Sequence, residues 1–134
     1  MGQFANQMQG WVQKTMAKSD TAVRMIALRM FSRIILKSPV LSGRFRGNWQ
    51  LAIGSVPEGT LELDDKTGTA TIAKGAATAL GFNAGETIFF ANNLPYARRL
   101  EEGYSQQAPA GMVALTVQEF QSIVSAIGIE LSFQ

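Results

Sequence analysis

The sequence predicts an α+β fold, in which N-terminal and C-terminal helices pack on a small mixed or antiparallel sheet. Near both ends of the chain, apolar residues recur every three or four positions, which is the period of a helix with one buried face. Between them, two short stretches at residues 48–56 and 86–91 are typical of strands. At 134 residues the chain has the usual length of one domain, so residues 1–134 are assigned to a single domain.

Two helices are predicted in the N-terminal part. Residues 3–17 have apolar side chains at helical spacing, beginning with Phe4 and Met8. A second helix is expected from about Ser19 to Lys37, because the serine and proline at 38–39 disfavour its continuation. One stripe of this second helix is apolar, and another carries three cations: Arg29, Arg33 and Lys37.

The middle of the chain is expected to form a strand, a surface loop and a short helix. Residues 48–56 alternate apolar and polar side chains, and residues 57–68 are rich in turn formers. Residues 69–82 fit a short helix through their alanines, and we favour that helix. A hairpin that pairs TLEL with TATIA around DDKTG is the alternative.

The C-terminal part is predicted to contain two helices and a last strand. A short helix is expected to begin within residues 94–97, after two asparagines that can cap it, and to end at Gly103. A longer helix should run from Pro109 and end at Gly128, with an edge strand following at residues 129–133. Four aromatic residues on apolar faces are expected to be largely buried: Trp49, Phe89, Tyr96 and Phe120.

Composition excludes several classes of function. There is no cysteine, which removes disulfides and thiolate chemistry, and no histidine, which is the usual general base near neutral pH. The formal net charge is only +2, with both signs interspersed, so composition alone does not indicate a nucleic-acid-binding protein. No apolar run approaches the roughly 20 residues of a membrane-spanning helix, and no secretory leader is recognisable. We therefore expect no enzyme, cofactor or membrane partner.

The acidic residues do not form a recognisable catalytic or metal site. Glu62, Asp64 and Asp65 lack the spacing of a calcium loop, so a solvated acidic turn is expected there. Glu101 and Glu102 are adjacent and would point about 100° apart on a helix, which does not suit a carboxylate pair. They are expected instead to form surface ion pairs with arginines at positions 98 and 99.

Two arginines, Arg44 and Arg46, lie between glycines at positions 43 and 47. Glycine-flanked backbone beside arginine can bind phosphate, but the Gly-Lys-Ser/Thr signature of a nucleotide loop is missing. We favour pairing of these arginines with carboxylates of the same or a neighbouring chain.

Two blocks of the sequence, when taken together, form a distinctive pattern: SPVLSGRFRGNWQ at residues 38–50 and IFFANNLPYARRLEEGYSQQAPAGMVALTVQEF at residues 88–120. They resemble the neck, or tail-completion, proteins of tailed bacteriophages. The family pattern has Ser/Thr-Pro-Val, Asp-Thr-Gly-Arg and Trp in the first block, and Pro-Tyr-Ala, Leu-Glu, Gln-Ala-Pro and Gly-Met-Val in the second. This chain departs from the pattern at Leu41-Ser42, which replaces Asp-Thr, and at Glu102, which replaces Tyr.

The resemblance implies a structural protein of the virion, assembled in the host cytoplasm as a ring, expected to be hexameric, at the head–tail junction. It implies three kinds of partner: further copies of the chain, the head-connector and tail-tube or tail-terminator proteins, and genomic DNA that passes without sequence-specific binding. Candidate contact residues are Arg29, Arg33, Lys37, Arg44, Arg46, Arg98, Arg99, Glu101, Glu102, Gln106 and Gln107. We expect most of the first five to be neutralised at subunit contacts by Glu101, Glu102 or Glu119.

The alternative is a free nucleic-acid-binding regulator. The three cations of the second helix, together with Arg44 and Arg46, could contact phosphates. Salt-dependent, sequence-specific DNA binding would favour this alternative over the neck protein.

Overall fold

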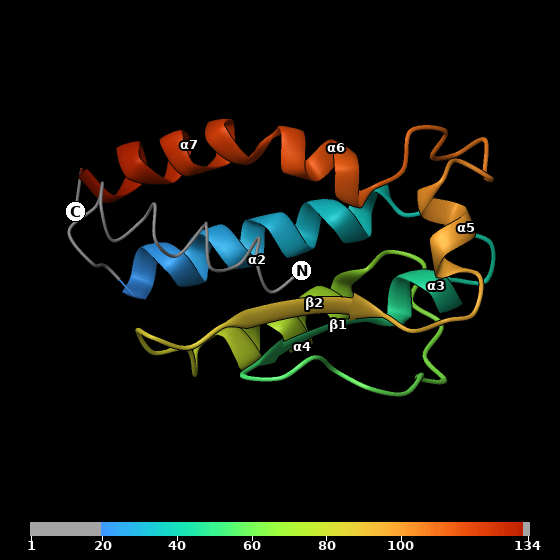
Figure 1. The fold of residues 1–134 in the computed structure, drawn as a ribbon, viewed down its shortest axis with the longest axis horizontal. Helices are drawn as coiled ribbons and strands as arrows, with labels where there is room; N and C mark the ends of the chain where they lie inside the picture. Colours follow the sequence, from blue (N-terminus) through green and yellow to red (C-terminus); the bar gives the residue numbers. More distant parts are fainter. Residues whose placement is uncertain (1–19, 133–134) are drawn as a thin grey trace.

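The computed structural model describes residues 20–132 and confirms the predicted α+β fold, with helices packed on a small antiparallel sheet (Figure 1). In chain order the described elements are α2 (Asp20–Lys37), α3 (Arg44–Gly47), β1 (Trp49–Ile53), α4 (Thr69–Ala79), β2 (Ile88–Asn92), α5 (Ala97–Glu101), α6 (Val113–Gln118) and α7 (Phe120–Ser132). The helix predicted for residues 3–17 lies outside the described residues.

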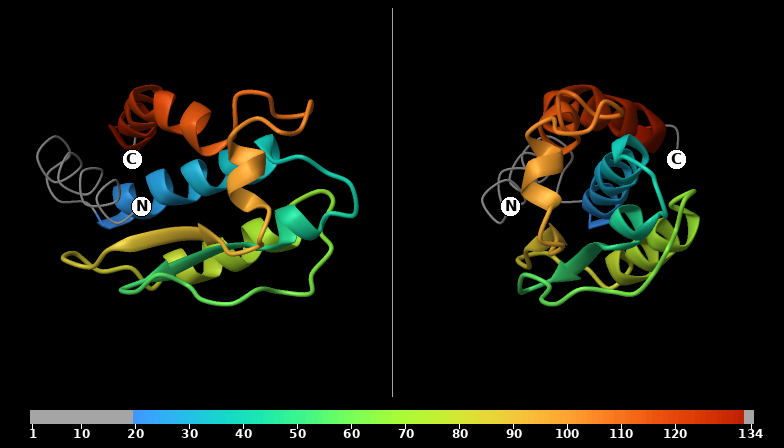
Figure 2. Two further views of the ribbon diagram at one scale, coloured as in Figure 1. Left: turned by 45° about the vertical axis from the view of Figure 1, so that its right-hand side comes forward. Right: turned by 90° about the vertical axis from the view of Figure 1, so that its right-hand side faces the viewer.

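Helix α2 is packed on two sides. The sheet and α4 lie on one side of it, and α6 and α7 lie on the other (Figures 1 and 2). Its buried residues accordingly form a wide band: Ala22, Val23, Ile26, Ala27, Met30, Phe31, Ile34 and Ile35. A helix covered on two sides needs a broader apolar surface than one narrow stripe. The prediction of a helix that ends before Ser38 is confirmed.

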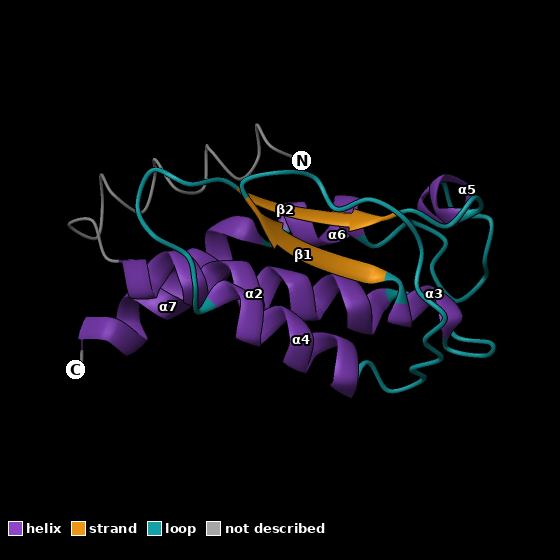
Figure 3. Cartoon of the chain, turned by 90° about the horizontal axis from the view of Figure 1, so that it is seen from below, coloured by secondary structure: helices purple, strands orange, loops and turns teal. Residues whose placement is uncertain are grey.

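The sheet consists of two antiparallel strands. In the register Trp49 pairs with Asn92 and Ile53 pairs with Ile88. Both predicted strands are confirmed, although each is shorter than the predicted stretch. Helix α4 lies in the long connection between the strands and packs against β1 and α2 (Figure 3).

The helix predicted over residues 69–82 is confirmed as α4, and the hairpin alternative is wrong. Its N-terminus is capped from a distance by Asp65, which is only 8% exposed. The Asp65 carboxylate accepts hydrogen bonds from the Gly68 amide (3.1 Å), the Thr71 amide (2.8 Å) and the Thr71 hydroxyl (2.7 Å). The expectation of a solvated acidic turn is therefore wrong for Asp65, because the start of the helix supplies donors that replace water.

The prediction for the C-terminus is partly wrong. Two helices, α6 and α7, replace the single helix, and α7 continues through Gly128 to Ser132 in place of the predicted strand. Glycine ends a helix when it takes the left-handed conformation, and Gly128 is not among the positive-φ glycines. The apolar alternation after it was too short to outweigh continued helical hydrogen bonding, and Ile129 is exposed.

The aromatic predictions are confirmed for Trp49 only. Its ring is buried against Phe45, with the ring centroids 5.8 Å apart. Phe89 and Phe120 are half-buried, and Phe120 packs at the edge of the core. The prediction for Tyr96 is wrong, since 42% of this residue is exposed.

Candidate functional site

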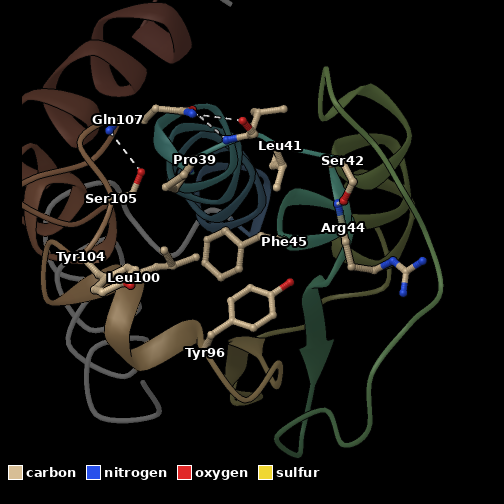
Figure 4. Close-up of a pocket in the computed structure, with 12 residues that line it drawn as sticks. Pro39, Leu41, Ser42, Arg44, Phe45, Tyr96, Leu100, Tyr104, Ser105 and Gln107 are labelled. Atoms are coloured by element: carbon tan, nitrogen blue, oxygen red, sulfur yellow. Dashed lines mark hydrogen bonds between the residues drawn. The ribbon is translucent and has the colours of Figure 1, made fainter.

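The two sequence blocks that carry the resemblance fold together at one end of the molecule. They line a cavity of about 340 Å³ between α3 and α5, which we call the end groove (Figure 4). Its apolar lining consists of Pro39, Val40, Leu41, Phe45, Tyr96, Leu100 and Tyr104. Residues that are far apart in the sequence thus form one surface.

The first wall of the end groove begins where α2 ends. Ser38 is buried, and its hydroxyl donates to the Ile34 carbonyl at 2.8 Å. The same hydroxyl accepts a hydrogen bond from the Trp49 indole nitrogen at 2.8 Å. This chain of hydrogen bonds joins the end of α2 to the first strand and fixes where the loop 38–43 leaves the helix.

Arg46 also fixes the position of this loop. Its guanidinium donates to three backbone carbonyls, those of Ser38 (3.0 Å), Lys66 (2.8 Å) and Leu36 (3.0 Å). Carbonyls at the end of a helix have no partner within the helix, so a cation there is favourable. Arg46 therefore stabilises the frame of the groove.

Gly43 lets the loop enter α3. Its φ of 91° is strained for residues with a side chain, and a β-carbon there would collide with the backbone of Asp65 and Lys66. Because of this close approach, the segment that precedes α4 packs directly against the loop 38–43, which forms the first wall of the groove. The short helix α3 was not among the predicted elements.

Gln107 ties the second block to the first. Its side-chain oxygen accepts from the Val40 amide at 2.8 Å, and its side-chain nitrogen donates to the Val40 carbonyl at 3.1 Å (Figure 4). Both hydrogen-bonding groups of one backbone residue are thus satisfied by one amide side chain. Gln106 and Gln107 are both exposed, but within residues 20–132 only the Gln107 side chain forms hydrogen bonds.

Apolar side chains remain exposed on this rigid frame. Leu41 is 94% exposed and Tyr104 is 73% exposed, and the Arg99 guanidinium lies 5.3 Å from the centre of the Tyr104 ring. Tyr96 stands against Phe45 with 6.2 Å between the ring centres. Exposed aromatic and aliphatic residues around a preformed hollow are characteristic of protein contacts.

Most of the predicted cations have carboxylate partners within the same chain. Arg29 pairs with Glu130 at 3.0 Å, and the Glu119 carboxylate pairs with Lys37 at 2.5 Å and Arg33 at 3.4 Å. The hydrogen bond from Lys37 is the main reason that the pKa of Glu119 lies below its ordinary value. These pairs attach α2 to the C-terminal helices, so neutralisation at subunit contacts is not needed for them.

Arg44 is also paired within the chain. Its guanidinium donates to the Asp64 carboxylate at 2.7 Å, and this contact raises the pKa of Arg44. The partner is not one of the glutamates named in the prediction. Arg44 lines the end groove, whereas Arg29 and Arg33 do not.

The ion pairs predicted for Glu101 and Glu102 are replaced by a different arrangement. The Glu101 carboxylate accepts from the amides of Met112 (3.0 Å), Val113 (2.9 Å) and Ala114 (3.0 Å), and so caps the start of α6. In the described part of the chain, Glu102 and Arg98 form no ion pair, and both are exposed. The prediction is wrong because it considered only neighbours on one helix.

The sequence did not indicate the apolar part of the site. Leu41 and Tyr104 were not among the candidate residues, although both lie within the resembling blocks. A leucine that replaces the family's aspartate at a turn was the available signal. Phe45 and Leu100 give no comparable signal, because buried and groove-lining apolar residues look alike in a sequence.

Histidine and cysteine are missing from the whole sequence, and residues 20–132 contain no group of three or more acidic side chains that could hold a metal ion. None of the helices in this range is long and apolar enough to cross a bilayer. Comparison of the chain with protein-family models, curated proteins and solved structures finds no match.

Proposed function

We propose that this protein is a structural component of the neck of a tailed bacteriophage, where copies form a ring that joins head and tail and continues the DNA channel. The observation that carries the proposal is the end groove. The two blocks that resemble neck proteins lie far apart in the sequence, and together they build this one surface. Two apolar residues that lie within these blocks, Leu41 and Tyr104, remain exposed beside the groove, where they are available to a partner.

The architecture of the groove also supports a binding role. Its walls are fixed by Ser38, Arg46 and Gln107 through contacts to backbone atoms, while Leu41 and Tyr104 stay largely exposed. A preformed surface loses little conformational entropy when a partner binds. A groove with fixed walls and exposed apolar residues suits a protein that assembles with others.

The alternative, a free nucleic-acid-binding regulator, is less well supported by the contacts. Four of its five proposed phosphate-binding cations already pair with carboxylates, and Arg46 donates to backbone carbonyls. Binding of DNA would have to break these pairs. These residues therefore offer phosphates little positive charge that is not already neutralised.

The proposal is tested by the state of the purified full-length protein and by its presence in particles. We expect light scattering and negative-stain imaging to find closed rings, alone or with connector and tail proteins, and virions to contain the protein. Leu41→Asp should assemble poorly while its thermal unfolding midpoint stays near that of the wild type, because this side chain is almost fully exposed. A strictly monomeric protein that is missing from virions would contradict the proposal.

A further inference from the structure

Within residues 20–132, one side of helix α2 stays open to solvent. Its positions follow one another at intervals of three or four residues along the helix: Thr21, Met25, Leu28, Ser32 and Leu36. Thr21 and Leu36 are exposed, Leu36 by 55%, and the other three residues are half-buried. We call these five residues the open stripe. It presents three apolar side chains along the length of α2, those of Met25, Leu28 and Leu36.

Helix α4 borders the open stripe and forms a groove with it. The two helices contact each other along their sides (Figure 3). The groove has a volume of about 540 Å³, and its apolar lining combines one end of the stripe with the last turn of α4: Met25, Leu28, Ala76, Ala77, Ala79 and Leu80. Small alanines leave room for the backbone of another helix to approach. Arg24 also lines the groove, but its guanidinium donates to the Phe82 carbonyl at 3.0 Å, so its charge is directed to the turn after α4.

The chain outside the described residues begins at this groove. Residues 1–19 join α2 at Asp20, one residue before Thr21, which lines the groove. The sequence predicts a helix over residues 3–17, so only Lys18 and Ser19 would connect that helix to α2. Two helices joined by such a short connection form an antiparallel hairpin. The predicted helix is therefore expected to run back along α2.

The predicted helix matches the open stripe in length and spacing. At a rise of 1.5 Å per residue, residues 3–17 extend over about 22 Å, and so does the stripe from residue 21 to residue 36. The apolar stripe of the predicted helix also has intervals of three and four residues: Phe4, Met8, Trp11 and Thr15. Folding back across Lys18 and Ser19 places Trp11 opposite Leu28 and position 8 opposite position 32. Helices whose apolar residues recur at these intervals stay in contact along their length.

We propose that residues 3–17 form a helix that packs antiparallel on the open stripe of the same chain, with Trp11 between Leu28 and the alanines of α4. Burial of this indole, together with the half-buried Met25 and Leu28, removes apolar surface from water. The cations of the segment do not oppose the contact, because Lys14 lies off the apolar stripe and Lys18 lies in the connection. The inference goes beyond the proposed function, since it concerns contacts within one chain.

The absence of cysteine allows a direct test in the full-length chain. Met8→Cys combined with Ser32→Cys should form a disulfide within one chain on mild oxidation, because the proposed register places these positions opposite each other. Gln9→Cys combined with Ser32→Cys is the matched control. Position 9 is equally close along the chain, but it lies about 100° away around the predicted helix. We expect the first pair to oxidise about tenfold faster than the second. Non-reducing gels and mass spectrometry distinguish disulfides within one chain from those between chains.

A second measurement uses the equilibrium constant for unfolding. The combined effect of Trp11→Ala and Leu28→Ala should be smaller than the product of the two single effects by about threefold or more, because residues in contact are coupled. Trp11→Ala combined with Val56→Ala, at an exposed residue outside the groove, should give the simple product.

Equal oxidation rates for the two cysteine pairs, or independent effects of Trp11→Ala and Leu28→Ala, would overturn the contact and leave the proposed function standing. Disulfides that form mainly between chains would also overturn it, and would show that the segment of one copy binds another copy.

Discussion

Polar side chains in this protein stabilise backbone groups at the ends of its elements. Asn48, which is fully buried, donates to the carbonyls of Arg44 and Leu61 and accepts from the Leu61 amide. Asp65 and Glu101 cap helices from outside those helices. Unpaired polar groups inside a protein are costly, so Asn48 and Asp65 satisfy groups in the interior, whereas the amides that donate to Glu101 are partly buried or exposed.

Asp65→Ala should destabilise the protein by about 2–3 kcal/mol, because three donors at the start of α4 lose a charged acceptor. The neighbouring variant, Asp64→Ala, removes only a half-exposed ion pair with Arg44. It should leave the denaturation midpoint almost unchanged. Urea unfolding of both variants checks this prediction, and equal midpoints would show that the cap is unimportant.

The same carboxylate makes stability depend on pH. Burial opposes its ionisation, but hydrogen bonds from Thr71 and Gly68 outweigh burial and hold the pKa of Asp65 below its ordinary value. Its contribution is therefore fully present above the unfolded-state pKa of about 4, and it is lost as pH falls through the lower folded-state pKa. The difference in thermal midpoint between wild type and Asp65→Asn should shrink below about pH 4. A difference that stays constant down to pH 2 would contradict this assignment.

Glu101→Ala should cost about 1–2 kcal/mol, since three amides at the start of α6 lose their acceptor. Glu102→Ala is the matched control, because this exposed neighbour makes no such contacts within residues 20–132. Chemical denaturation of the two variants should separate them clearly. Similar losses would support the simple surface ion pairing that the sequence suggested.

At the scale of elements, local pattern predicted most of the fold. The apolar spacing of α2, the alternation in β1 and the alanines of α4 each identified the correct element. The last strand was wrong because Gly128 does not adopt the conformation that ends a helix. Caps such as Glu101 act across 11 or more residues, so a pattern of near neighbours could not reveal them. The groove was unpredictable for the same reason, since its walls come from distant segments.

Removing the Gln107 side chain tests how the two blocks are joined. Gln107→Ala frees the Val40 amide, whose hydrogen exchange should accelerate about fivefold to tenfold, equivalent to roughly 1 kcal/mol. Gln106→Ala should not change exchange at this amide. If the Val40 amide hydrogen exchanges equally fast in both variants, the hydrogen bonds from Gln107 do not hold the loop in solution.

At the scale of the whole molecule, the weak net charge of +2 is combined with internal pairing of the cations on α2. Glu119 is central to this arrangement because one carboxylate pairs with both Arg33 and Lys37. A protein that surrounds moving DNA should not hold phosphates strongly, since each bound phosphate adds a salt-dependent affinity. In the neck ring proposed above, internal pairing would achieve this without removing the cations that attach α2 to the C-terminal helices.

Glu119→Gln tests whether this pairing suppresses binding to DNA. The variant leaves Arg33 and Lys37 without their carboxylate, so nonspecific affinity for duplex DNA should rise. With two additional phosphate contacts, the slope of log affinity against log salt should steepen by up to about 2. Fluorescence anisotropy with a labelled duplex at several salt concentrations measures this slope. Glu130→Gln provides a comparison, because it frees a single cation, Arg29, and should steepen the slope by about half as much. Tight, sequence-specific binding by the wild type would instead favour the regulator, and an unchanged slope in both variants would show that these cations do not reach DNA.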